Sequence, residues 1–236
     1  MPRTEPTARH VTTPAAPLAP DPLGPALALL ELASIAVGIE AGDAMVKRAP
    51  VEVVHAGTIH PGKYLVLVAG AVADVEEALA AGLEVGQACL VDTVFLPNVH
   101  RRVVAALRGA RRAGTGDALG IVETATVAAT IEAADAGVKG ARVELLELHL
   151  ADGLGGKGYL LFDGSVSDVE AAVSIAVERI SDPAAGSGAV PGSRAPIARV
   201  IPQLHREMRA ELEAGPRFAT RGAGATRGAG ATGGEA

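Results

Sequence analysis

The chain has 236 residues and a formal net charge of -6, and 49% of its residues are hydrophobic while only 2% are aromatic. This acidic balance, without a basic face, argues against nucleic acid as a partner. No apolar run approaches the ~20 residues that a helix needs to cross a bilayer. Cys89 is the single cysteine, so one chain forms neither a disulfide nor a cysteine-based metal cluster, and we expect a protein of the reducing cytoplasm.

Composition and periodicity predict the structure of the N-terminal segment and of the first strand and helix. Residues 1–25 are rich in proline, threonine and alanine, which predicts a disordered arm. A docking peptide for another protein is the alternative. Residues 26–31 are a short apolar run, typical of a buried strand. Ser34 can then cap a helix over residues 35–48, and Pro50 ends it.

Three further strands and two further helices complete a first unit. Acidic residues in its first turn favour the helix after Gly70, because the helix dipole stabilises negative charge there. The last helix is expected to open at Pro97, since proline is well tolerated at a first helical position. The strands are expected at 51–59, 64–69 and 90–96, and the helices at 72–86 and 97–108. The order β-α-β-β-α-β-α is that of a ferredoxin-like α/β sandwich, an α/β (α+β) fold.

The stretch Leu27–Val54 occurs twice. Its second copy is Leu119–Leu146, which aligns without a gap at a constant offset of 92. The identical positions include Leu27, Glu31, Ala33, Ile39, Glu40, Ala41, Asp43, Ala44, Val46, Lys47, Ala49, Val51 and Glu52. A shared helical propensity does not explain this much identity, so the chain is expected to contain one fold twice.

The repeat sets the expected domain boundaries. A glycine-rich segment separates the two copies, and few contacts are expected across such a linker. An insertion in the second copy and a tail that contains ATRGAG twice are expected to be flexible. The boundaries are 1–25 for the arm, 26–108 for the first domain, 109–117 for the linker, 118–212 for the second domain with its insertion at 181–193, and 213–236 for the disordered tail.

The two copies differ in length at two places. From Lys63 and Lys157 onward the offset is 94, because the turn before Lys157 is two residues longer than its counterpart. After the insertion the offset is 105, so that Pro97-Asn98-Val99-His100-Arg101 pairs with Pro202-Gln203-Leu204-His205-Arg206. The retained proline, histidine and arginine extend the repeat to the end of both copies.

Recurring carboxylates are the strongest candidates for catalysis. Paired carboxylates can perform acid–base chemistry, but each of these lies near a helix start or on a helix face, where a cap or an ion pair is the structural alternative. No nucleophile lies at a defined spacing from a base, and the histidines form no metal-binding pattern. We therefore expect no enzyme and no bound metal. The carboxylates are Glu31 and Glu123, Glu40 and Glu132, and Asp43 and Asp135.

The glycine-rich turn Gly153–Gly158 has the composition of a phosphate-binding loop. It lacks the GxxxxGK[ST] spacing, and it joins two expected strands rather than opening onto a helix N-terminus. An oligomeric regulatory protein that binds a nucleotide or small anion at this turn remains the alternative function. Close packing of loops around a symmetry axis is the other explanation for so much glycine, because glycine permits close backbone approach.

The repeated stretch also resembles the signature of a known family. IEAGDAMVKRAPVEVV and IEAADAGVKGARVELL are similar to the helix-and-strand signature of the bacterial microcompartment (BMC) shell domain. The resemblance covers residues 26–108 and 118–212. Two fused copies resemble the tandem-domain members, which assemble as trimers that mimic the hexamers of single-domain members. It therefore implies two tandem BMC domains and a homotrimeric, pseudohexameric tile, which in some members stacks face to face.

The resemblance implies roles for two sets of residues. Lysines at the tile edge pack tile against tile in the family, and they correspond to Lys47 and Lys139. Asn98 and Gln203 stand at an edge position where single-domain members often carry arginine. The loops between paired strands line a central pore, and the longer one has room to gate it. These loops are Thr58, Ile59, His60, Pro61 and Gly62 in the first copy and Ala151, Asp152, Gly153, Leu154, Gly155 and Gly156 in the second.

Partners and cofactors are implied in the same way. The expected partners are other copies of the chain, other microcompartment shell proteins and small polar metabolites that cross the pore past His60, Lys63 and Lys157. Neither nucleic acid nor a membrane is expected. Some tandem members hold an iron–sulfur cluster through a pore-loop cysteine, but neither loop has one here, so no cofactor is expected. The implied role is structural, in the shell of a cytoplasmic microcompartment.

Overall fold

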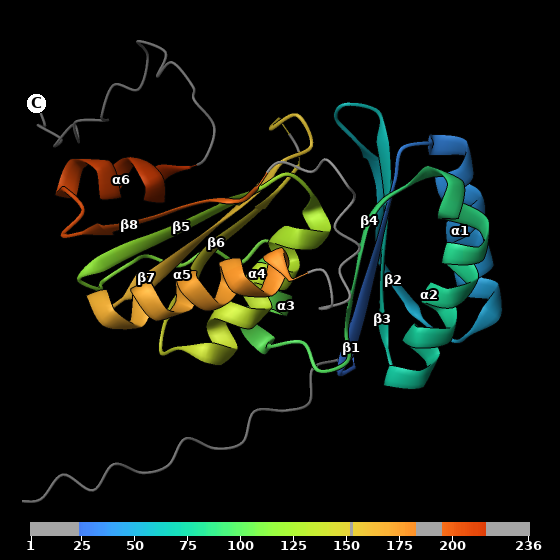
Figure 1. Ribbon diagram of the computed structural model, residues 1–236, viewed down its shortest axis with the longest axis horizontal. Helices are drawn as coiled ribbons and strands as arrows, with labels where there is room; N and C mark the ends of the chain where they lie inside the picture. Colours follow the sequence, from blue (N-terminus) through green and yellow to red (C-terminus); the bar gives the residue numbers. More distant parts are fainter. Residues whose placement is uncertain (1–23, 152, 183–194, 216–236) are drawn as a thin grey trace, which may run out of the picture.

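The computed structural model describes residues 24–151, 153–182 and 195–215, which fold into two α/β units joined in tandem (Figure 1). Nearly all of the predicted arm, Asp152, most of the predicted insertion and most of the predicted tail lie outside the described residues. The first unit ends after α3 and the second begins with β5. Both units have the same order of strands and α-helices and the same order of strands in the sheet.

The first unit is a four-stranded antiparallel sheet with two long helices on one face (Figure 1). The strand order is β2-β3-β1-β4. This confirms the ferredoxin-like order that the sequence predicts. The elements are β1 (Ala26–Leu32), α1 (Ile35–Arg48), β2 (Glu52–Ile59), β3 (Lys63–Gly70), α2 (Val72–Gly86), the short 3-10 helix η1 (Gln87–Cys89), β4 (Leu90–Leu96) and α3 (Arg101–Leu107).

The second unit repeats this architecture with the strand order β6-β7-β5-β8. Its last helix runs two residues past the predicted domain end at 212, and Leu212 in its last turns packs against the sheet. The elements are β5 (Ala118–Thr124), α4 (Val127–Gly140), β6 (Glu144–Leu150), β7 (Gly158–Gly164), α5 (Val166–Ser181), β8 (Ile197–Pro202) and α6 (Arg206–Ala214).

Side-chain acceptors fix where several helices begin. Ser34 Oγ accepts the Val37 N–H at 3.4 Å at the start of α1, as the sequence predicts. The helix predicted from Pro97 is wrong in its start, since α3 begins at Arg101 and Pro97 belongs to a turn. His100 Nδ1 accepts the Arg102 N–H at 3.2 Å and supplies the cap that proline cannot.

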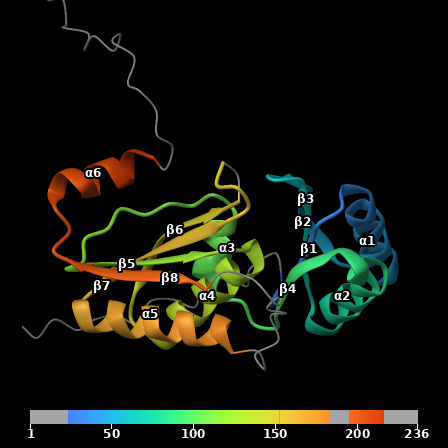
Figure 2. The same ribbon diagram turned by 45° about the horizontal axis from the view of Figure 1, so that its top comes forward.

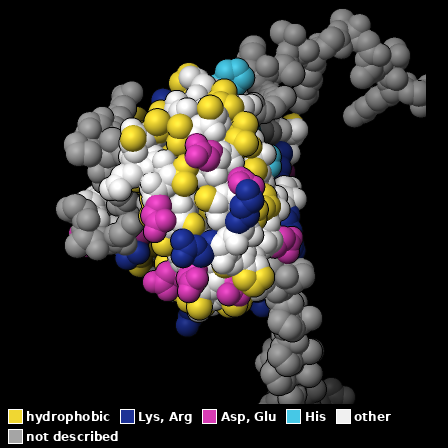
Figure 3. Space-filling view, turned by 90° about the vertical axis from the view of Figure 1, so that its right-hand side faces the viewer, with side chains coloured by type: hydrophobic (Ala, Val, Ile, Leu, Met, Phe, Trp, Pro, Cys, Tyr) yellow, Lys and Arg dark blue, Asp and Glu magenta, His cyan; other side chains and the backbone are white. Residues whose placement is uncertain are grey.

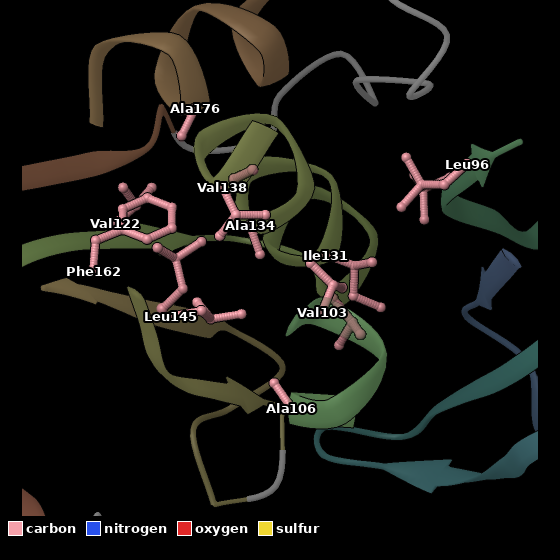
Figure 4. Close-up of a cluster of buried hydrophobic side chains, with 14 of the residues drawn as sticks. Leu96, Val103, Ala106, Val122, Ile131, Ala134, Val138, Leu145, Phe162 and Ala176 are labelled. Carbon is pink, nitrogen blue, oxygen red and sulfur yellow. The ribbon is translucent and has the colours of Figure 1, made fainter. Parts of the chain in front are cut away.

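Helix α4 lies between the two sheets (Figures 1 and 2). One face of the first sheet packs against α1 and α2 through residues that include Leu30 and Met45. The opposite face joins a larger core, in which Leu96 of β4 packs in one cluster with Ile131 of α4 and Phe162 of β7 (Figure 4). The second unit therefore completes the hydrophobic core of the first.

Candidate assembly interface and pore loops

The two units meet along an extended surface, the intrachain joint. It consists of β1, β4 and α3 of the first unit packed against α4 and β6 of the second. Most residues of α4 are buried, including Val127, Ile131 and Val138. An amphipathic surface helix needs only one apolar stripe, so this degree of burial shows that α4 is covered on two sides.

Two carboxylates of the first sheet hold the N-terminal end of α4. The Val127 N–H donates to Glu31 Oε2 at 2.9 Å, and Thr126 Oγ1 donates to Asp92 Oδ2. Lys63 Nζ donates to Oε1 of the same Glu31 at 2.7 Å. The unpaired N–H groups carry the positive end of the helix dipole, which favours negative charge here. Glu31 is thus fully paired although none of it is exposed.

At the N-terminal end of α4, Asp92 is a carboxyl group with a shifted pKa. Burial raises the pKa of Asp92 to about 6, and the nearby charges of Glu31 and Glu132 add to the rise. Hydrogen bonds from Thr126 and from the Thr93 N–H act in the opposite direction, because they stabilise the ionised form. Desolvation dominates, so the intrachain joint contains a carboxyl group that titrates close to neutrality.

The C-terminal end of α4 is held by the segment between β4 and α3. Asp135 Oδ1 accepts the His100 N–H at 2.7 Å, and its Oδ2 accepts from Lys139 Nζ at 2.5 Å. Lys139 Nζ also donates to the Asn98 carbonyl oxygen at 2.5 Å. Burial, followed by the charge of Arg102, lowers the pKa of His100. The neutral imidazole thereby remains an acceptor at the start of α3.

Arg102 of α3 closes the joint on the side of β6. Its guanidinium donates to the Val143 carbonyl oxygen at 2.8 Å and forms an ion pair with Glu144. Arg112 approaches the same carboxylate at 3.3 Å. Arginine suits this place because its planar donors can serve a carbonyl and a carboxylate together.

Helix α1 shares 8 of its 14 residues with α4, but no second sheet covers it within the part of the chain that the structure describes. Ile39 is 56% exposed, whereas its counterpart Ile131 is 0% exposed. Ile35 and Val46, the counterparts of Val127 and Val138, are exposed too. Hydrophobic side chains lie among acidic and basic ones on this side of the first unit (Figure 3). An apolar stripe of this kind on a helix indicates a surface that another element covers.

The second unit carries the counterpart of the surface that covers α4. Its β8 and α6 correspond to β4 and α3, and His205 Nδ1 accepts the Glu207 N–H at 3.4 Å as His100 does for Arg102. Ile197 and Met208 are exposed there. The exposed face of α1 and this surface lie at opposite ends of the molecule (Figure 1). Among the described residues of one chain, these two matching surfaces are therefore unpaired.

The first predicted pore loop is the tight turn between β2 and β3. The Gly62 N–H donates to the Ile59 carbonyl oxygen at 2.9 Å, the His60–Pro61 peptide bond is cis, and Gly62 has a φ of 99°. Thr58, His60, Pro61 and Gly62 are exposed and Ile59 is half-buried. The turn thus presents a histidine at its tip.

The second predicted pore loop joins β6 to β7, and its residue Asp152 lies outside the described residues. The Leu154 N–H donates to the Ala151 carbonyl oxygen at 3.0 Å, and the Ala151 N–H donates to the Lys157 carbonyl oxygen at 2.9 Å. Ala151, Gly153, Gly155 and Gly156 all have positive φ, which favours glycine.

The two loops lie side by side. A Cβ on Gly156 would lie 3.0 Å from the His60 carbonyl oxygen and 3.1 Å from Pro61 Cδ. Both hairpins point the same way (Figure 1). The glycine is therefore required by a close approach between the units, and the fold brings together the two loops that the sequence predicts to share a pore.

The other predicted residues fall into two pairs. Lys139 and Asn98 meet at the intrachain joint, beside a shallow hollow that they line with Val99, His100 and Arg101. Lys47 bonds Asp43 at 2.5 Å on α1, and Gln203 follows β8 at the other end of the molecule (Figure 1). The second pair does not meet within the described chain.

Sequence reasoning missed Asp92, Thr126 and Arg102 as joint residues. Asp92 gives a usable signal, because it is a charged residue inside the apolar run of β4. Arg102 gives none, since its partner Glu144 is 42 residues away and only the packing of α3 brings them together.

Neither a metal centre nor a membrane segment is found in the part of the chain that the structure describes. No group of three His, Cys, Asp or Glu side chains there could hold a metal ion. No helix there is long and apolar enough to cross a membrane. The glycine-rich turn joins two strands, as predicted, so it is not placed at a helix N-terminus.

A family model, a curated protein and a solved structure that are similar to this chain all belong to bacterial microcompartments. The BMC domain family model matches twice, at residues 26–99 and 118–190. The chain is 43% identical over 190 residues to the bacterial microcompartment shell protein PduT of Citrobacter freundii, covering 80% of this chain and 98% of that one. The crystal structure of a microcompartment protein from Desulfitobacterium hafniense is similar with a TM-score of 0.65 and 36% identity, covering 78% of this chain and 98% of that one.

Proposed function

Because the chain belongs to the bacterial microcompartment shell protein family, with two BMC domains in tandem, we propose that three copies close into a pseudohexameric tile with a central pore. The role is structural, and the chain catalyses no reaction. Small polar metabolites cross the tile through the pore, and the outer edges contact other shell proteins.

The observation that carries this proposal is the difference between α4 and α1. The first unit covers Val127, Ile131 and Val138 of α4 within the chain. Their counterparts on α1, Ile35, Ile39 and Val46, are exposed. When the second unit of one chain covers α1 of the next, the joint between chains repeats the intrachain joint. Head-to-tail contacts of this kind generate a ring when the rotation closes. Three chains give six units and six joints.

Matched residues support the joint between chains. Glu123 stands where Glu31 stands, so in the ring it accepts the Ile35 N–H of the next chain. Asp43 and Lys47 take the places of Asp135 and Lys139, and they meet His205 and Gln203 of the neighbour. Burying Ile35, Ile39 and Val46 adds apolar contact to that joint.

The pore is proposed from the direction of the joint. Lys63 and the touching loops lie at the N-terminal end of α4, and Lys139 with Asn98 lies at its C-terminal end. Repeating the joint around a ring gathers the loops at the centre and leaves the lysines at the rim. The loops of Thr58–Gly62 and Ala151–Gly156 then alternate around the axis. Lys47, Lys139, Asn98 and Gln203 form the edge that meets other tiles.

The residues that line the proposed pore indicate which class of solute crosses it. Exposed His60, small residues and glycine backbone border the hole, and Lys63 and Lys157 stand at the loop bases, paired with Glu31 and Glu123. Polar groups at a narrow opening favour polar solutes over apolar ones. The glycines of the longer loop give it the freedom to gate the pore.

The proposal is tested by solution mass from light scattering and by imaging concentrated protein for hexagonal sheets. The wild type should have the mass of three chains, or of six if two tiles stack. Ile39→Glu should dissociate the trimer, because it places a charge in the joint between chains. Val72→Glu, at an exposed position of α2, is the matched control and should remain trimeric. A monomeric wild type at micromolar concentration contradicts the proposal.

A further inference from the structure

The two kinds of joint differ in charge at several positions, and one of them is the position of Arg102. Within the chain, Arg102 of α3 bonds the Val143 carbonyl oxygen and pairs with Glu144 of β6. The capping histidines His100 and His205 align α3 with α6 residue by residue, so Glu207 occupies the place of Arg102. The preceding Arg101 is retained as Arg206, whereas Arg108 at the end of α3 is, like Arg102, replaced by a glutamate, Glu213.

The partner of that position keeps its charge. Glu52 opens β2 as Glu144 opens β6, and Val51 corresponds to Val143. Glu52 and Glu207 are both exposed in the single chain. In the ring, α6 of one chain lies over β2 of the next as α3 lies over β6, so the two glutamates face each other where an arginine–glutamate pair stands in the intrachain joint.

From this juxtaposition we infer that Glu52 and Glu207 form a repulsive pair at each joint between chains, and that this pair sets how easily the ring opens and exchanges subunits. The inference rests on the proposed trimer. The apolar contact of α1 holds the ring together, and the glutamates act against it. The two units of one chain are covalently linked, so the ring opens between chains, where the repulsive pair lies.

The response of the joint to salt concentration distinguishes a repulsive pair from an attractive one. Added ions screen exposed charges, and they relieve a repulsive pair as effectively as they weaken an attractive one. Raising the salt concentration should therefore tighten the joint between chains. An interface held by attractive surface ion pairs shows the opposite response.

The test measures subunit exchange between isotopically labelled and unlabelled full-length protein by native mass spectrometry, at about 0.05 M and 0.5 M salt. The variants are Glu207→Arg, which restores the intrachain pattern, and Glu52→Arg, which restores it from the other side. Glu170→Arg, on the exposed face of α5, makes the same change of charge outside the joint and is the matched control.

Wild-type exchange should slow as salt rises, and each restoring variant should slow exchange at low salt by roughly two- to fivefold per joint. The control should exchange like the wild type. Faster or unchanged exchange in both restoring variants, in particles of trimer mass, overturns the inference. It would indicate that Glu207 pairs with a cation, such as the exposed Arg48 of the neighbouring chain. A wild type that has no trimer mass instead overturns the proposed function, so the two failures are distinguishable.

Discussion

Individual carboxylates at the intrachain joint combine poor solvation with specific pairing. Glu31 is fully buried but bonds both Lys63 and the Val127 N–H, so its charge is compensated. Asp92 receives hydrogen bonds from Thr126 and the Thr93 N–H, and no cation among the described residues forms an ion pair with it. Hydrogen bonds alone do not offset the desolvation of a carboxylate. The two residues therefore affect stability in different ways.

The raised pKa of Asp92 predicts a stability that depends on pH. The folded pKa of about 6 lies above the ordinary value of 3.8, so the unfolded chain loses this proton first as pH rises. Ionisation of Asp92 therefore lowers the free energy of unfolding between about pH 4 and pH 6, by at most about 3 kcal/mol. Asp92→Asn should be more stable than the wild type above pH 6, and the difference should shrink toward pH 4.

Chemical denaturation at a series of pH values measures this difference. Glu170→Gln, which neutralises an exposed carboxylate, is the control and should show no such trend. A wild-type minus variant difference that is constant with pH contradicts the assignment. The same residue shows what sequence can supply: a lone aspartate in the apolar strand LVDTVFL marks an unusual site, but Thr126, its partner, is 34 residues away.

At the scale of elements, α1 and α4 show that sequence fixes a helix and packing fixes its burial. Both helices keep the isoleucine, valine, acid and lysine positions of the repeat, and both follow a Ser or Thr cap. Their boundaries could be predicted because caps and periodicity are local. Their unequal cover could not, because it depends on which surface of the other unit reaches them.

The turn between β6 and β7 gives a prediction at this scale. Gly153 and Gly156 both have positive φ, but a Cβ on Gly153 meets nothing within 4 Å whereas one on Gly156 meets the backbone of the first loop. Gly153→Ala should cost about 1 kcal/mol of backbone strain. Gly156→Ala should cost this and about 1–3 kcal/mol more, because it forces the two loops apart.

Urea unfolding of the two variants isolates the contact between loops, since the backbone strain is common to both. Equal losses would show that the loops do not press against each other at Gly156. The close contact between the two loops at Gly156 had only an indirect signal in the sequence. A run of glycines suggested close packing of backbone, but the identity of the neighbouring segment depends on the docking of one unit against the other.

At the scale of the whole molecule, the structure shows the intrachain joint, and the proposed ring adds a second joint between chains. The first unit alone would leave one face of its sheet uncovered, and the chain covers that face by placing α4 between the two sheets. In the proposed ring, another chain covers the exposed face of α1. Glu123 is the residue that best reports it, because in the single chain its side chain is 38% exposed and pairs with Lys157 at 2.8 Å.

Glu123→Ala should therefore have different effects in the two states. In a single chain, an exposed pair of this kind contributes about 0–1 kcal/mol. In the ring, the substitution leaves Lys157 and the Ile35 N–H of the next chain without their partner in a buried joint, which should cost about 1–3 kcal/mol per joint. Thermal unfolding of protein verified as trimeric by mass measures the loss, with Glu170→Ala as control. A trimer that melts at the wild-type temperature argues against the joint.

The sequence by itself determined the tandem repeat, the order of elements in each unit, the family resemblance and the positions of both loops, because periodicity, caps, turns and identity are local or aligned features. It misplaced the start of α3, where the competing cap at His100 is stronger than the proline signal at Pro97. Only the tertiary structure decided that Asp92, Thr126 and Arg102 form a joint, that Gly156 touches His60, and that α4 is covered while α1 is exposed. These facts depend on contacts between residues far apart in the chain, which form when the faces of two units are brought together.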